Sequence, residues 1–416
     1  MQVENRRRQI QPRRLSQQQP PVKSRRRVRT KFSTKFSNLK YRNILCLIAG
    51  AIAIGWIITL PFRARRPIEP PVILPQETIA PLPTTETTET AENSIAPQDD
   101  RTFSYNIKTP PNPVYSQELQ QIVDEAAKIA TAKELPADKL SITLIDVSNP
   151  QNHTFAGYQN QTLRFPASVA KLFWMAAFYS ALEKGLITKR ESAFTSDLEQ
   201  MMRISNNDAA SRLLDHITDT KSGGRLSGEE LATWLQKRRK INDFFQSAGY
   251  ENIILSTKNY PIYYLRQEQP VGRDVQQLRG DGSGLLRNQV TTDQAARLIY
   301  EIYTRQAVSS VASRKMAYLL TRDLDPKAWK NDPTNPIAEF LGESLPTNIY
   351  FGSKVGYTSK SRSEAAFVRT LDDRAIYILV VFGDAPAYAK DKTIFPEISR
   401  YVFDRLNTRG PSTSTN

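Results

Sequence analysis

The pattern of apolar and polar positions divides the chain into three kinds of segment. Ile44 to Leu60 reads ILCLIAGAIAIGWIITL without a single charge. With Pro61 and Phe62 this run reaches about the 20 residues that cross the hydrocarbon core of a bilayer. Polar and basic residues fill the segment before it, and prolines and threonines recur in the segment after it. Regular apolar periodicity begins only near Ser116, so we expect one transmembrane helix ahead of one folded region.

From Ser116 onward the pattern predicts helix, two strands, a helical middle, three strands and a final helix. The expected helices cover 116–133, 168–184, 198–204, 205–214, 229–248, 292–302, 316–320 and 395–406. The expected strands cover 140–147, 153–158, 348–354, 364–370 and 375–382. We expect the strands from the two ends to form one antiparallel β-sheet flanked by helices, and the middle to form an all-helical lobe. This is an α+β fold.

The positive charge lies almost entirely at the N-terminal end. The chain has a formal net charge of +15, and residues 1–66 hold 17 Lys and Arg with one acid, Glu4. The remainder is nearly neutral, so we expect no nucleic-acid partner. Fourteen of these cations precede the apolar run. The positive-inside rule then places the N-terminus in the cytoplasm and the folded region outside, in the periplasm or extracytoplasmic space.

Five segments follow from these patterns: a basic, disordered cytoplasmic arm (1–43), a transmembrane anchor (44–62), a Pro/Thr-rich linker (63–115), a folded domain (116–407) and a disordered tail (408–416). The anchor predicts a single pass through the cytoplasmic (inner) membrane. A cleaved signal peptide is the alternative, but the leader is long and no small-x-small site follows the run. The arm either attracts anionic lipid or only sets the topology.

Few residues are available for metal or thiol chemistry. The only cysteine, Cys46, lies in the apolar run, so the chain can form no internal disulfide and no thiolate metal site. The only histidines are His153, in an expected hairpin, and His216, in an expected helix. We interpret both as structural and expect no metal and no cofactor.

The candidate nucleophile is Ser168, in Phe165-Pro-Ala-Ser-Val-Ala-Lys171-Leu-Phe-Trp-Met175. At i and i+3 of a helix, Ser168 and Lys171 share one face. A lysine in apolar surroundings loses proton affinity and can serve as a base, which activates a serine without histidine. Ser37 and Lys40 have the same spacing in the basic arm, so the spacing alone decides nothing.

Two further patterns lie downstream. Ser205-Asn206-Asn207 interrupts the helical middle, where a second hydroxyl can relay a proton to a leaving nitrogen. Lys354-Val355-Gly356 ends an expected strand, where the lysine offers positive charge and the glycine allows a close backbone approach. The three patterns occur in the order helix start, helix break, strand end.

In this order the sequence resembles the penicillin-recognising serine enzymes, whose signature is S-x-x-K, S-D-N and K-T-G. Within that group it is most similar to class A β-lactamases, also through segments 203–214 and 288–299 and the strand–strand–helix end. The resemblance covers about residues 116–407. It implies a β-lactamase/transpeptidase-like fold in which Ser168 is the acylated nucleophile, Lys171 is its base partner and Ser205 relays the proton.

The resemblance also implies a set of substrate-binding residues. Asn207 would orient the substrate, and Lys354 and Gly356 would line the far wall. The backbone N–H groups of Ser168 and Tyr357 would form the oxyanion hole. Val355 departs from the signature because it cannot hydrogen-bond a substrate carboxylate, and Thr358 is a candidate to compensate.

Two other departures concern the helical lobe. Only 37 positions separate Ser168 from Ser205, fewer than is typical of class A enzymes. The deacylating glutamate of those enzymes is missing, because the residues at its expected place are Lys258, Asn259 and Tyr260. The nearest carboxylates, Glu251, Glu268 and Asp274, lie outside the expected pattern.

Three functions remain open. The first is a membrane-anchored serine hydrolase that is acylated by β-lactams and hydrolyses them slowly. The second is a DD-peptidase-like, penicillin-binding enzyme that acts on peptidoglycan peptides. The third is a non-catalytic domain that binds peptidoglycan. The expected partners are therefore a β-lactam or peptidoglycan peptide and, through residues 44–62, the inner membrane.

Overall fold

The structure, a computed structural model, describes Phe103, Tyr105, Ile107 and residues 109–279, 286–332 and 335–409. The chain divides into two compact units, 1–67 and 68–416, and all described residues belong to the second. The predicted arm, the predicted anchor (44–62) and most of the predicted linker lie outside the described residues. Among those described, no helix is both long enough and apolar enough to cross a membrane.

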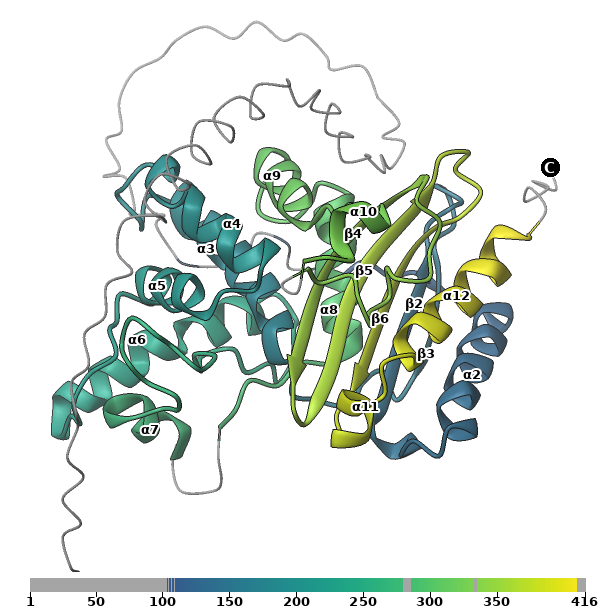
Figure 1. Cartoon of the computed structure of the whole chain (residues 1–416). Coiled ribbons are helices and arrows are strands. Elements are labelled where there is room, and N and C mark those ends of the chain that lie inside the picture. Colours follow the sequence, from purple (N-terminus) through teal and green to yellow (C-terminus); the bar gives the residue numbers. More distant parts are fainter. Residues whose placement is uncertain are drawn as a thin grey trace, which may run out of the picture. The chain divides into compact units, whose positions relative to one another are not determined.

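One six-stranded sheet organises the domain, in the order β1-β3-β2-β6-β5-β4 (Figure 1). The strands are β1 (Val114–Tyr115), β2 (Leu140–Asp146), β3 (Thr154–Tyr158), β4 (Ile349–Thr358), β5 (Ser361–Thr370) and β6 (Ile376–Gly383). Strand β2 pairs with β6 over seven residue pairs, from Leu140–Gly383 to Asp146–Tyr377. The prediction that strands from the two ends join into one sheet is therefore confirmed.

The sheet is mixed, so the prediction of a purely antiparallel sheet was wrong. Strand β1 pairs with β3 in parallel, through Val114–Thr154 and Tyr115–Phe155. Its chain passes directly into α2 (Gln117–Ala132), which Ser116 caps by accepting from the Leu119 N–H. Helix α2 and strand β2 reverse the direction twice before β3, which leaves β1 and β3 pointing the same way. A two-residue strand is too short to show a periodicity in the sequence.

Helices cover both faces of the sheet. In Figure 1, α2 and α12 lie against one face, and α8 and the helical lobe lie on the other. The remaining helices are α3 (Ala170–Glu183), α4 (Thr195–Arg203), α5 (Asn207–Thr218), α6 (Gly228–Gln246), α7 (Gly272–Arg279), α8 (Thr292–Tyr303), α9 (Ser310–Leu320), α10 (Pro326–Trp329), α11 (Pro386–Lys390) and α12 (Ile394–Asn407). Two hydrophobic cores result, one on each face of the sheet.

Helix α3 is the centre of the larger core. Its sequence AKLFWMAAFYSALE is largely apolar apart from Lys171, Ser180 and Glu183, and every residue from Ala170 to Ala181 is buried. A helix that is hydrophobic all round is stable only when protein surrounds it. The segment that begins at Ser168 is thus enclosed by the lobe on one side and the sheet on the other.

Three described residues of the predicted linker also pack on the domain. The Phe103 ring stacks on Phe244 with ring centres 4.5 Å apart. The Tyr105 hydroxyl donates to Glu301 Oε2 at 2.7 Å. Ile107 packs against the same core. The residues just before β1 therefore contact the helical lobe.

Candidate active site

Ser168 occupies a strained turn at the entrance to α3. It lies in a single 3₁₀ turn, Ala167–Val169, that continues directly into the helix. The preceding Ala167 has φ +47°, a left-handed conformation that costs a non-glycine residue on the order of 1–3 kcal/mol. Such strain persists only where surrounding structure imposes it. Ser168 is the residue of this turn that lines a cleft.

Lys171 is fully buried and held by three hydrogen bonds to the helix break downstream. Its Nζ donates to Asn207 Oδ1 at 2.7 Å, lies 3.3 Å from Ser205 Oγ and also donates to the Ser205 carbonyl oxygen. Burial lowers the pKa of Lys171 to about 7. A neutral amine that donates two hydrogens, to Asn207 and to the Ser205 carbonyl, keeps a lone pair free to accept a proton.

Ser205 and Asn207 are positioned by the junction of α4 and α5. Ser205 has φ +59° and separates the two helices. Asn206 caps α5, because its side chain accepts from the Ala209 N–H at 3.0 Å. This cap leaves Asn207 in the first turn of α5, where its amide oxygen reaches Lys171.

Lys354 reaches the same hydroxyl from the sheet. From strand β4 its Nζ donates to Ser205 Oγ at 2.9 Å and to the Val355 carbonyl at 3.0 Å. Burial, followed by the positive charges of Lys171 and Arg322, holds the pKa of Lys354 well below its ordinary value. Ser205 Oγ thus lies between two lysines, and a proton on either one disfavours a proton on the other.

Gly356 allows β4 to pass directly against the nucleophile. A Cβ at this position would lie 2.4 Å from the Pro166 carbonyl oxygen and 2.9 Å from the Ser168 backbone nitrogen. Only glycine leaves room for this approach. The backbone of Ser168 and the strand that carries Tyr357 are therefore neighbours, as a two-donor oxyanion hole requires.

The cleft around Ser168 has a volume of about 680 Å³. One side comes from the helical lobe, through Ser205, Asn207 and Tyr260. Val355 and Tyr357 of the edge strand β4 also line it. The opposite side was not anticipated from the sequence, because it belongs to an irregular segment between α9 and β4. That segment contributes Trp329, Lys330, Asp332, Asn335, Pro336, Ala338, Glu339 and Phe340.

Lys171, Lys354 and Gly356 do not line the cleft themselves, but they lie against Ser205, Asn207 or Ser168, which do. The remaining expected site residue is Thr358. Its hydroxyl lies 3.0 Å from Ser361 Oγ and accepts from the Lys360 N–H at 3.1 Å, so it belongs to the β4–β5 turn. Thr358 is absent from the residues that line the cleft. The histidines also lie elsewhere: His153 Nδ1 is 2.9 Å from the Tyr300 hydroxyl, and His216 packs against Phe194.

The segment at the expected place of a deacylating carboxylate carries none. Lys258 turns away from the cleft, and its Nζ donates to Asp215 Oδ2 at 2.7 Å and Ser222 Oγ at 2.8 Å. Asn259 Nδ2 donates to the Ala167 carbonyl at 3.3 Å, next to the nucleophile. Tyr260 is the residue of this segment that faces the cleft.

The nearby carboxylates are used in other contacts. Asp274 is buried, 3.9 Å from Arg238. Of the described residues, only Asp332 and Glu339 contribute carboxylates to the cleft, both from the segment opposite the lobe. Glu339 pairs with Arg362 at 3.1 Å and with Lys392 at 2.6 Å. No cluster of three metal-ligating side chains occurs in the part of the chain that the structure describes.

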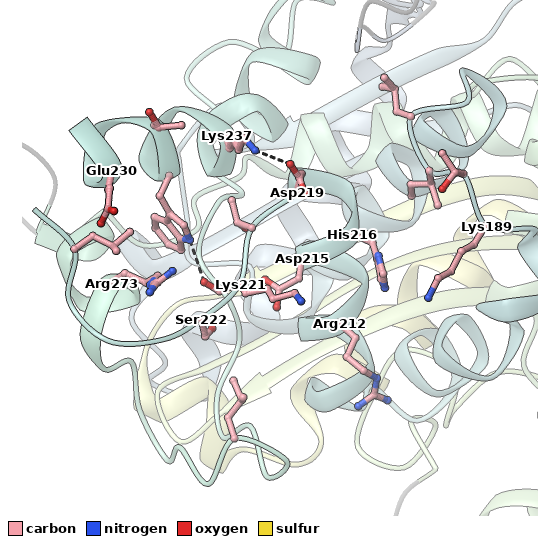
Figure 2. Close-up of a pocket in the computed structure, with 18 of the residues that line it drawn as sticks. Lys189, Arg212, Asp215, His216, Asp219, Lys221, Ser222, Glu230, Lys237 and Arg273 are labelled. Carbon is pink, nitrogen blue, oxygen red and sulfur yellow. Dashed lines mark hydrogen bonds and ion pairs between the residues drawn. The ribbon is translucent and has the colours of Figure 1, made fainter. Parts of the chain in front are cut away.

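A larger hollow of about 1110 Å³ lies in the helical lobe and does not include Ser168 (Figure 2). Its labelled side chains carry both signs of charge, among them Lys189, Arg273 and Glu230. The ion pair of Lys237 with Asp219, at 2.6 Å, spans part of it. Because none of the expected site residues lines this hollow, the chemistry belongs to the smaller cleft.

The model of the β-lactamase enzyme family matches residues 119–406, and the chain therefore belongs to this family. The resemblance inferred from the sequence motifs is confirmed. No curated protein matches the sequence.

Several solved structures are similar at low identity. One is the β-lactamase from Sphaerobacter thermophilus DSM 20745 (17% identity, TM-score 0.48, covering 70% of this chain and 99% of that one). Another is PBP-A (15% identity, TM-score 0.48, covering 72% of this chain and 100% of that one). A third is a class A β-lactamase from Bacteroides cellulosilyticus DSM 14838 (16% identity, TM-score 0.47, covering 71% of this chain and 100% of that one).

Proposed function

We propose that this protein is a serine hydrolase that β-lactams acylate at Ser168 and that releases the product slowly. The observation that carries the proposal is the cluster of two buried lysines and two half-buried polar side chains at the cleft that Ser168 lines. It joins Lys171, Ser205, Asn207 and Lys354 through hydrogen bonds of 2.7 to 3.3 Å. A domain that only binds peptidoglycan needs no buried lysine one helical turn after a serine that lines the cleft.

The acylation step uses Lys171 and Ser205 of this cluster. Neutral Lys171 takes the proton of Ser168, whose Oγ attacks the carbonyl carbon. The negative charge that develops on the carbonyl oxygen is stabilised by the backbone N–H groups of Ser168 and Tyr357. As the amide C–N bond breaks, Ser205 gives its proton to the leaving nitrogen, and the proton that Lys171 received replaces it.

Hydrolysis of the acyl-enzyme is the slow step in this proposal. It requires a base that activates water, and the segment at Lys258–Tyr260 offers an ammonium, an amide and a phenol. Burial raises the pKa of Tyr260 above the ordinary value, so this phenol stays protonated and cannot act as the base. The same feature favours the second candidate, a DD-peptidase-like enzyme acting on peptidoglycan peptides, in which acylation matters more than fast release of drugs.

We further propose that residues 44–62 anchor the protein in the inner membrane, with the catalytic domain in the periplasm. The supports are the uncharged run and the excess of basic residues before it. If the run is an anchor, the protein stays in the membrane pellet after alkaline extraction, and deletion of residues 44–62 releases it. Release of the intact full-length protein by the same extraction would contradict the anchor.

The acylation proposal is tested by incubating the full-length protein with a fluorescent penicillin and following the mass of the labelled protein over time. We expect one equivalent of label that persists for many minutes. Ser168→Ala should take up no label. Ser37→Ala, which alters the serine with the same spacing in the basic arm, should label like the wild type.

The three functions give different results in this experiment. Absence of label in the wild type would leave only the binding domain. Label that disappears within seconds would show an efficient β-lactamase and would contradict the slow-release proposal. Persistent label, together with release of D-alanine from a peptidoglycan peptide, would favour the peptidase.

A further inference from the structure

A cation and two aromatic rings form an ordered surface on the side of the cleft opposite the lobe. We call Phe340, Tyr357 and Arg362 the aromatic wall. All three line the cleft that contains Ser168. The Arg362 guanidinium carbon lies 4.9 Å from the centre of the Phe340 ring and 5.2 Å from the centre of the Tyr357 ring. None of the catalytic steps proposed above uses these side chains.

Arg362 is fixed by its hydrogen bonds, and it supports the two rings. Its Nη1 donates to the Glu339 carbonyl at 2.7 Å, and its Nη2 to the Glu339 carboxylate at 3.1 Å and the Ala389 carbonyl at 3.0 Å. Its Nε donates to the Tyr388 carbonyl at 3.2 Å. The side chain is buried, and each of its three nitrogens already has an acceptor.

Tyr357 presents the open surface of the wall. The residue is 54% exposed, although it belongs to a strand whose preceding eight residues are buried. It is paired with Arg362 on the neighbouring strand, so both side chains leave the sheet on the same face. Phe340 is almost buried behind them. A flat apolar group of a substrate can therefore stack on Tyr357, whose position is set by the residues behind it.

The aromatic wall and Ser205 line the same cleft, and strand β4 connects them. Lys354, three positions before Tyr357 on β4, donates to Ser205 Oγ at 2.9 Å. Arg322, at the start of the segment that carries Phe340, donates from Nη2 to the Met202 carbonyl at 2.6 Å and the Ser353 carbonyl at 2.9 Å. This arginine joins the end of α4, just before Ser205, to strand β4. Asn259 of the segment 258–260 instead contacts the carbonyl of Ala167, the residue before Ser168. Because Ser205 protonates the leaving nitrogen in the proposed function, the wall adjoins the leaving group.

We propose that the aromatic wall is a leaving-group subsite that selects substrates whose leaving nitrogen carries a large, flat, apolar substituent. This inference rests on the proposed function, which assigns the leaving-group side through Ser205. The ring of Tyr357 stacks on that substituent before and during acylation, and it does not touch the acyl side of the substrate.

Two cephalosporins test this selectivity. Nitrocefin and cephalothin share the same thienylacetyl group on the acyl side, but nitrocefin carries a flat dinitrostyryl group on the leaving-group side where cephalothin carries a small acetoxymethyl group. The measurement is the ratio of their second-order rate constants for acylation of the full-length protein. In Tyr357→Ala this ratio should fall about three- to tenfold, the range of one aromatic stacking contact.

Two matched variants serve as controls. Tyr357→Phe keeps the ring and should keep the ratio within about twofold of the wild type, as a stacking contact requires. Tyr115→Ala removes a tyrosine of similar exposure, 52%, from the opposite edge strand β1 and should not change the ratio. An unchanged ratio in Tyr357→Ala, or a loss in Tyr357→Phe, would overturn the inference.

A second measurement does not depend on acylation. Binding of the two compounds to Ser168→Ala is measured by titration calorimetry, with and without Tyr357→Ala. Tighter binding of nitrocefin that disappears with the tyrosine supports the subsite even if the wild type takes up no label. Equal binding of both compounds overturns the subsite even if Ser168 is acylated.

Discussion

The two polar regions that border Ser168 differ in what they can do. On one side, the buried Lys171 and Lys354 are joined to the half-buried Ser205 and Asn207 by hydrogen bonds of 2.7 to 3.3 Å. On the other side, the segment 258–260 directs its lysine away to Asp215 and presents only an amide and a phenol. The first region contains everything that proton transfer during acylation requires. The second lacks a group that could activate water.

In the proposed function, the two halves of the serine hydrolase cycle depend on separate parts of the fold. The hydrogen-bonded cluster of lysines and polar side chains described above depends on α3, the α4–α5 junction and β4. Buried packing fixes all three of these elements. The segment 258–260 belongs to a loop, so a single substitution there can change the rate of deacylation without changing the rate of acylation. Substitutions on either side therefore affect different rate constants.

The largest effect is expected from Lys171→Met, which removes the base but keeps a side chain of similar volume. The rate of acylation should fall about 100- to 10,000-fold, the range that a general base supplies. Lys171→Arg is the matched control, because a guanidinium does not lose its proton in a protein. It should be impaired to a similar degree. A labelling rate near that of the wild type in Lys171→Arg would show that the lysine contributes only charge.

Gly356→Ala should have the next largest effect. The new methyl group would collide with the Pro166 carbonyl and the Ser168 nitrogen, so β4 must move away from the oxyanion hole. Loss of one such donor costs on the order of 100-fold in rate. Gly224→Ala is the control, because a Cβ there meets nothing within 4 Å. The labelling rates of the two variants are compared, and equal rates would contradict the role of the close approach.

The most direct test of the difference between the two regions introduces a carboxylate into the segment 258–260, which has none. Tyr260→Glu introduces it at the residue of this segment that lines the cleft. The bound label should be released about 10- to 100-fold faster, at the lower end of what a positioned base supplies. Tyr260→Gln introduces a side chain with the shape of glutamate but without its charge, and it should release label as slowly as the wild type. Equally fast release from both variants would point to water access as the limit.

The elements that carry the candidate site residues were largely predictable from the sequence, because they depend on local patterns. The apolar run after Lys171 specifies a buried helix, and the Ser205 motif falls where the helical pattern breaks. The three C-terminal strands show long runs that are buried on both faces. Each motif was therefore assigned to its element, and the structure brings these elements together.

The rest depends on contacts between distant residues. Strand β1 exists only because β3 offers it an edge, and its two residues carry no pattern of their own. The wall formed by Phe340 and Tyr357 depends on Arg362 from a third segment, and nothing in the sequence around Phe340 indicates a cleft. Thr358 is a candidate from the sequence because Val355 lacks the hydroxyl of the family signature, yet the β4–β5 turn engages the Thr358 hydroxyl.

The dependence on pH separates the two halves of the cycle without any substitution. Since burial lowers the pKa of Lys171 to about 7, its neutral form predominates above pH 7 and its protonated form below. Acylation should therefore slow about tenfold between pH 8 and pH 6, as expected for a base that must be neutral. Release of the label should change much less, because the segment 258–260 presents no carboxylate to the cleft. Burial also raises the pKa of Glu364 to about 7, so the profile is repeated with Glu364→Gln. If that variant loses the pH dependence of labelling, the titrating group is the glutamate, and the two sides of the nucleophile are less different than their hydrogen bonds indicate.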